Sequence, residues 1–143
     1  MRYLGLDVGK ATIGVAVSDL LGLTAQGVET VRRTNLESDL KRLTEIADKY
    51  ETTAFVVGLP KNMNGTEGES AIYARDFADE LKKIIPEAQI SFWDERLTTV
   101  AAHKTLIEAD MSRKKRKKVV DKMAAVFILQ GFLDRLSMNM NKD

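Results

Sequence analysis

The chain has 143 residues, of which 44% are hydrophobic and 30% are charged, and its formal net charge is +1 at pH 7. This composition indicates one globular domain over residues 1–143, and no apolar run approaches the roughly 20 residues that span a bilayer. The absence of cysteine and the single histidine, His103, argue against disulfides, thiolate zinc sites and a histidine-based catalytic triad. We therefore expect any chemistry to rest on carboxylates, hydroxyls, lysine and arginine, with no membrane partner.

A glycine-punctuated apolar stretch begins the chain and contains one acid. Apolar residues alternate with small or polar ones over residues 3–8 and 13–17, which predicts two strands joined by a turn at Gly9. Asp7 then lies at the end of a strand that we expect to be central. A buried carboxylate is costly unless it is paired, hydrogen-bonded or bound to a cation. Asp7 is therefore either a turn-capping residue or a metal ligand, and Lys10 is either a phosphate contact or an ordinary turn residue.

The middle of the chain alternates between strand and helix. Residues 24–31 predict a third strand that completes a meander, and residues 34–37 have the form of a capping box for a helix that ends near Tyr50. The apolar run 53–59 predicts a parallel strand that is covered on both faces. A polar, glycine-bearing loop over residues 61–70 follows it, and loops at strand ends often carry function.

Two acids follow the next predicted strand. An amphipathic helix over residues 72–85 precedes a strand over residues 89–93, which leads directly into Asp94 and Glu95. Side chains alternate along an extended chain, so only one of these acids faces a given side of the sheet. One of the two, Asp94, is expected to pair with Arg96.

The last part of the chain holds a third predicted helix over residues 98–109, a basic run and a long final helix over residues 119–138. Six cations in succession form the basic run: Arg113, Lys114, Lys115, Arg116, Lys117 and Lys118. The run is either a solvated patch or a set of contacts to nucleic-acid phosphates. Asp121 lies on the apolar stripe of the final helix, so it needs a cation, which is either a basic residue nearby or a metal ion.

The order of these elements predicts an α/β fold with a mixed five-stranded sheet and helices on both faces. Asp7 and Glu95 end strands, and Asp121 lies near the start of a helix. Carboxylates that converge from separate elements repel one another unless a divalent cation lies between them. Oxygen-only ligands suit Mg²⁺ or Mn²⁺, and a two-metal site hydrolyses phosphodiesters without histidine or cysteine.

Five short motifs follow one another along nearly the whole chain: LGLDVG at 4–9, VGLP at 57–60, NGTEG at 64–68, DERLTT at 94–99 and DKMAA at 121–125. Together they resemble the successive motifs of the YqgF (RuvX) family. The resemblance implies a ribonuclease H-like fold and a cytoplasmic bacterial nuclease. It also implies a role, either in maturing the 5′ end of pre-16S ribosomal RNA or in resolving Holliday junctions.

The same resemblance assigns residues to the site. The catalytic and metal-binding acids that it implies are Asp7, Glu95 and Asp121. On the substrate side it places Arg96, Asn64 and Gly65. The related RuvC resolvases are expected to add a fourth acid one turn along the last helix, whereas the turns beside Asp121 hold lysines and alanines. We therefore expect a second metal ion to bind only together with substrate.

Several functions agree with these residues. The leading hypothesis is a metal-dependent endonuclease that acts on structured RNA, and the runner-up is a Holliday-junction resolvase, expected to be a homodimer because two strands must be cut. A nucleic-acid-binding module with a silent metal site is a third. A sugar-kinase or actin-like ATPase shares the Asp-x-Gly hairpin, but it binds nucleotide between two such domains and this chain has room for one.

Overall fold

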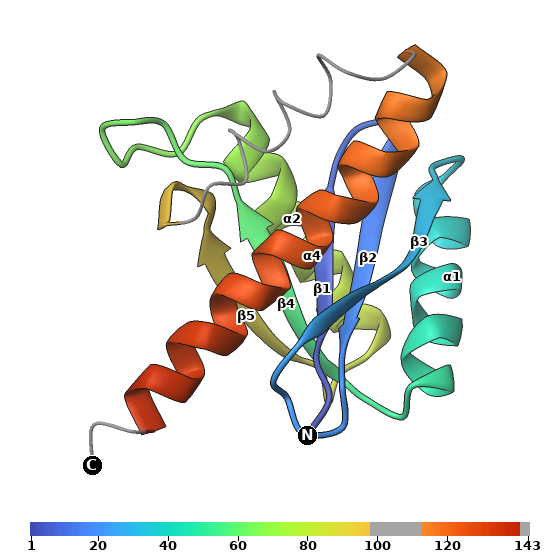
Figure 1. Ribbon diagram of the computed structural model, residues 1–143. Helices are drawn as coiled ribbons and strands as arrows, with labels where there is room; N and C mark the ends of the chain where they lie inside the picture. The colour runs from blue at the N-terminus through green and yellow to red at the C-terminus, as the bar shows by residue number, and fades with distance from the viewer. Residues whose placement is uncertain (98–112, 141–143) are drawn as a thin grey trace.

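The computed structural model describes residues 1–97 and 113–140, with side chains described for residues 1–97 and 123–139. Within this part, five strands form one mixed sheet in the order β3-β2-β1-β4-β5 (Figure 1). The central strand β1 is antiparallel to β2 and parallel to β4, and β5 is parallel to β4. The strands are β1 (Leu4–Val8), β2 (Thr12–Ser18), β3 (Ala25–Arg32), β4 (Ala54–Leu59) and β5 (Gln89–Asp94).

Helices cover both faces of this sheet (Figure 1). They are α1 (Leu36–Lys49), α2 (Glu69–Ile84) and α4 (Arg113–Met140), and a short 3₁₀ helix, η1 (Glu95–Leu97), follows β5. The buried apolar side chains form two clusters: one contains the inward faces of α1 and α2, and the other contains that of α4. The predicted α/β fold, with a mixed five-stranded sheet between helices, is therefore confirmed. No helix in the described part of the chain is long and apolar enough to cross a bilayer.

Some predicted boundaries were wrong. The final helix begins at Arg113 instead of near residue 119, so the basic run is itself helical. The first helix is capped by Asn35 and not by Thr34, because Oδ1 of Asn35 accepts a hydrogen bond from the backbone N of Ser38 at 2.9 Å. The second helix begins at Glu69, three residues before the prediction of residue 72. The predicted helix over 98–109 lies outside the described residues.

Candidate active site

Asp7 lies on the side of the sheet that α4 covers. Leu4 and Leu6, on the same strand, point to the opposite side and are fully buried in the cluster that contains the inward faces of α1 and α2. Gly5 faces α4, because a Cβ on Gly5 would lie 2.7 Å from Cβ of Leu129. Side chains alternate along a strand, so Asp7, two residues after Gly5, is directed to the α4 side and is half-buried there.

Gly58 on β4 lies beside the Asp7 position on β1 and also next to Glu95. Leu6 pairs with Val57, and one residue further along the two parallel strands come Asp7 and Gly58. A Cβ on Gly58 would lie 3.2 Å from Oε2 of Glu95 and 2.4 Å from Cδ1 of Ile128. The missing side chain thus leaves room for the Glu95 carboxylate on the same face of the sheet as Asp7. No pattern in the sequence shows that the lack of a Cβ at Gly58 makes room for an acid.

Asp121 is the third predicted acid, and its helical position is described although its side chain lies outside the described ones. It precedes Ala125 by four residues in α4, which is about one helical turn or 6 Å along the axis. The carbonyl oxygen of Ala125 would lie 3.0 Å from a Cβ on Gly5. Among the side chains that the structure describes, no group of three acids, histidines or cysteines could hold a metal ion.

Asp94 and Glu95 have different surroundings, as the alternation predicts. Nη2 of Arg96 donates a hydrogen bond to Oδ2 of Asp94 at 2.7 Å, so the predicted pairing of Asp94 with Arg96 is confirmed. The Arg96 guanidinium holds the pKa of Asp94 below its usual range, chiefly by this hydrogen bonding. Glu95 begins η1 and is directed to Gly58 instead. Of the two acids, Glu95 therefore faces the same side of the sheet as Asp7.

The loop after β4 is internally bonded and lies against Arg96. Both Oγ1 and the backbone N of Thr66 donate to Oδ1 of Asn64, at 2.6 and 3.1 Å. Gly65 has a φ of 88°, a conformation that favours glycine. Nη1 of Arg96 donates to the carbonyl oxygen of Met63 at 3.4 Å and would lie 3.4 Å from a Cβ on Gly65. The structure therefore brings two of the predicted substrate residues, Gly65 and Arg96, together, and Asn64 lies in the same loop as Gly65.

Lys10 lies in the turn between β1 and β2. Its Nζ is 3.2 Å from Oε1 of Glu69, the first residue of α2, and both side chains are largely exposed. A surface pair of this kind contributes only about 0–1 kcal/mol, so Glu69 does not prevent Lys10 from contacting another anion. The basic run over residues 113–118 occupies the first turns of α4, and its side chains lie outside the described ones.

Comparison with known proteins identifies the family. The RuvX family, described as Holliday junction resolvase, matches residues 1–135. A relative from Clostridium botulinum, provisionally named pre-16S rRNA nuclease, is 59% identical over 140 residues, covering 96% of this chain and 99% of the relative. A relative from Clostridium tetani with the same name is 60% identical over 134 residues, covering 94% and 96% of the two chains.

Solved structures agree on the fold. RuvC of Thermus thermophilus in complex with a Holliday junction has a TM-score of 0.58 at 14% identity and 96% coverage of both chains. The fowlpox virus resolvase, also solved with junction DNA, has a TM-score of 0.55 at 8% identity, covering 95% of this chain and 99% of that one. These similarities confirm the predicted ribonuclease H-like fold. The family match and the curated relatives confirm the predicted enzyme class, a nuclease that hydrolyses phosphodiester bonds. The chain therefore belongs to the RuvX family.

Proposed function

We propose that this nuclease is a metal-dependent endonuclease in which Asp7, Glu95 and Asp121 hold Mg²⁺ or Mn²⁺. The observation that carries the proposal is the seating of Glu95 against Gly58, next to Asp7 and on the same face of the sheet. The donor set fits a hard cation, because it consists of carboxylate oxygens, and the missing Cβ of Gly58 leaves room beside Glu95 on the face of the sheet. The position of Asp121, one turn before Ala125 in α4, is the remaining part of the set.

Each residue of the proposed site would have its own role in binding the metal ion or the substrate. A bound divalent cation would supply an activated water and neutralise charge at the scissile phosphate. Asp7 and Glu95 would hold it, and Ile128 closes the space beside Glu95 with an apolar side chain that limits access of water. Arg96, fixed by Asp94, would offer its exposed side to a substrate phosphate. The basic run at the start of α4 would extend these phosphate contacts.

The natural substrate that we propose is the 5′ end of pre-16S ribosomal RNA, processed in the cytoplasm during ribosome biogenesis. The names of relatives that are 59–60% identical over nearly the whole chain support this choice. The family description and the two resolvases support a four-way DNA junction as the second candidate. A resolvase would act as a homodimer, because it must cut two strands symmetrically.

The test is cleavage of labelled pre-16S RNA fragments and of a four-way DNA junction, each with Mg²⁺, Mn²⁺ or a chelator. Wild type is compared with Asp7→Asn and with Asp48→Asn, a matched change of an exposed acid on α1. We expect metal-dependent cutting that Asp7→Asn abolishes and Asp48→Asn leaves unchanged. Equal cutting by wild type and Asp7→Asn would refute the role of Asp7. Binding without cutting under every ion would favour the alternative of a nucleic-acid-binding module.

A further inference from the structure

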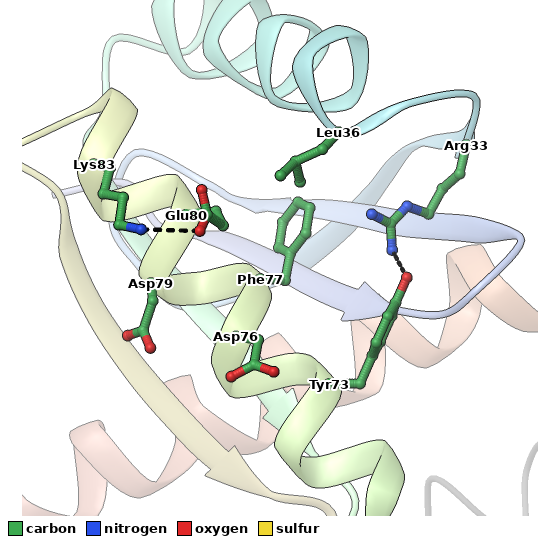
Figure 2. Close-up of a pocket in the computed structure, with 8 residues that line it drawn as sticks. All are labelled: Arg33, Leu36, Tyr73, Asp76, Phe77, Asp79, Glu80 and Lys83. Carbon is green, nitrogen blue, oxygen red and sulfur yellow. Dashed lines mark hydrogen bonds and ion pairs between the residues drawn. The ribbon is translucent and has the colours of Figure 1, made fainter.

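Arg33, just after β3, connects four parts of the molecule. Its Nη1 donates to the carbonyl oxygen of Gly9 at 3.0 Å and to the hydroxyl of Tyr73 on α2. Its Nε donates to Oδ2 of Asp39, in the first turn of α1, at 3.0 Å. The guanidinium also lies over the ring of Phe77, 5.2 Å from its centre. Figure 2 shows Arg33 directed at Tyr73, with Phe77 beside it.

This ion pair is unusual in its burial. The Arg33 side chain is 12% exposed and that of Asp39 is 2% exposed. Taking a charge pair out of water has a desolvation cost that the attraction between the two charges often fails to offset, and apolar residues of similar size serve as well or better for stability alone. The arrangement is therefore better explained by what it holds in place than by stability.

The contacts of Arg33 hold the turn that follows Asp7. The backbone N of Gly9 donates to the carbonyl oxygen of Thr12 at 2.9 Å, and the backbone N of Arg33 donates to the carbonyl oxygen of Ala11 at 3.0 Å. Together with the bond from Nη1 to Gly9, these contacts tie both sides of the turn to the end of β3. Gly9 is two residues from Asp7, so the position of Asp7 depends on this turn.

From these contacts we propose that Arg33 is a positioning residue for Asp7, acting through the carbonyl oxygen of Gly9. The inference rests on the proposed function, because Asp7 matters as a metal ligand there. Lysine cannot replace this arginine, because one compact ammonium group cannot present a planar fork to Asp39, Gly9 and Tyr73 at once. Loss of a partner that orients a metal ligand typically weakens metal affinity or activity about 10–100-fold.

The experiment compares Arg33→Lys with Arg42→Lys. Arg42 is a matched control, because it also pairs with a carboxylate, that of Glu29, but this pair lies on the exposed side of α1. Two quantities are measured: the Mn²⁺ concentration that gives half-maximal cleavage, and the rate of amide hydrogen exchange at Gly9. For Arg33→Lys we expect the Mn²⁺ concentration to rise about tenfold and the exchange to become about tenfold faster. Arg42→Lys leaves both unchanged.

Each outcome decides the question. Faster exchange with an unchanged Mn²⁺ requirement would make Arg33 merely structural and overturn the positioning role, as would no change in either quantity. If Arg33→Lys does not fold, Tyr73→Phe takes its place and must shift both quantities in the same direction by about two- to threefold, since it removes one hydrogen bond of the set. If wild type cleaves nothing, the proposed function fails, and Gly9 exchange then decides alone whether Arg33 orders the turn.

Discussion

Gly58→Ala tests the geometry of the site by adding one methyl group. The new Cβ would lie 2.4 Å from Cδ1 of Ile128, 3.1 Å from its Cγ1 and 3.2 Å from Oε2 of Glu95. The first contact is a clash inside the apolar cluster below α4, and the third displaces the Glu95 carboxylate by a few tenths of an ångström. One substitution therefore perturbs both packing and the site, and a second substitution can separate the two effects.

The magnitudes follow from the two contacts. Overpacking a core costs about 1–3 kcal/mol, which for a domain of this size lowers the Tm by roughly 4–12 °C. Ile128→Val removes Cδ1, so in the double variant the clash at 2.4 Å disappears and most of the stability returns. The contact with Glu95 remains in the double variant. Because catalysis is sensitive to small misplacements of catalytic groups, we expect cleavage to stay about tenfold or more below wild type.

The assay pairs urea unfolding with the single-turnover cleavage rate for wild type, Gly58→Ala, Ile128→Val and the double variant. Ile128→Val alone should cost about 0.5–1.5 kcal/mol and leave the cleavage rate within about twofold of wild type. If the double variant recovered both stability and cleavage, Glu95 would not depend on the space at Gly58. That result would refute the seating of Glu95 against Gly58.

Three further predictions concern the core, the pH dependence and the basic run. Gly5→Ala should destabilise the fold by about 1–3 kcal/mol in urea unfolding, and adding Leu129→Ala should not rescue it, because alanine keeps the Cβ that a Cβ on Gly5 would meet at 2.7 Å. Asp94→Asn should lower the free energy of unfolding at pH 7. Arg96 lowers the folded-state pKa of Asp94, so this stabilisation is fully present above the unfolded-state pKa of about 3.9. It is lost as the pH falls through the lower folded-state pKa. The difference in free energy of unfolding between wild type and Asp94→Asn should therefore disappear in acid. Glutamine at four positions of the basic run, 114–117, should weaken nucleic-acid binding and flatten its logarithmic salt dependence by up to about 3, as measured by fluorescence anisotropy.

The controls for these three predictions are equally specific. Glutamine at Lys82 and Lys83, in the last turn of α2, should leave nucleic-acid binding unchanged. An unchanged salt dependence after neutralising the basic run would remove it from the interface. A gap between wild type and Asp94→Asn that stayed constant down to pH 2 would show that the charge on Asp94 is not what stabilises the fold. Full rescue of Gly5→Ala by Leu129→Ala would contradict the close approach of α4 to β1.

The sequence predicts much of this fold because its signals are local. Alternation fixed the two strands around Asp7, and the continuous apolar run over 53–59 indicated a parallel strand, which the structure places as β4. The boundary of α4 escaped prediction because six adjacent cations resemble a solvated loop, although lysine and arginine are good helix formers. The cap at Asn35 was not predicted, because Thr34 and Glu37 have the spacing of a capping box that begins one residue earlier.

The site was predictable by residue type but not by geometry. Asp7 was identifiable from its position at the end of an apolar strand. Alternation showed that only one of Asp94 and Glu95 faces the site, and the motif resemblance favoured Glu95 and left Asp94 to pair with Arg96. The role of Gly58 depends on strand pairing between distant segments and on the approach of Ile128, which no local pattern encodes. The role of Arg33 was not predictable for the same reason, since its partners Gly9, Asp39 and Tyr73 come from separate parts of the chain.

The most direct test of the proposed metal site is a phosphorothioate substitution at the mapped cleavage position of the RNA. Replacing a non-bridging oxygen by sulfur disfavours the hard Mg²⁺ more than the softer Mn²⁺. If a metal held by Asp7 and Glu95 contacts this phosphate, Mg²⁺-dependent cleavage should fall sharply, Mn²⁺ should restore it, and Asp7→Asn should cleave under neither ion. Equal slowing by sulfur in Mg²⁺ and Mn²⁺ would contradict a scissile phosphate bound by a metal that Asp7 and Glu95 hold.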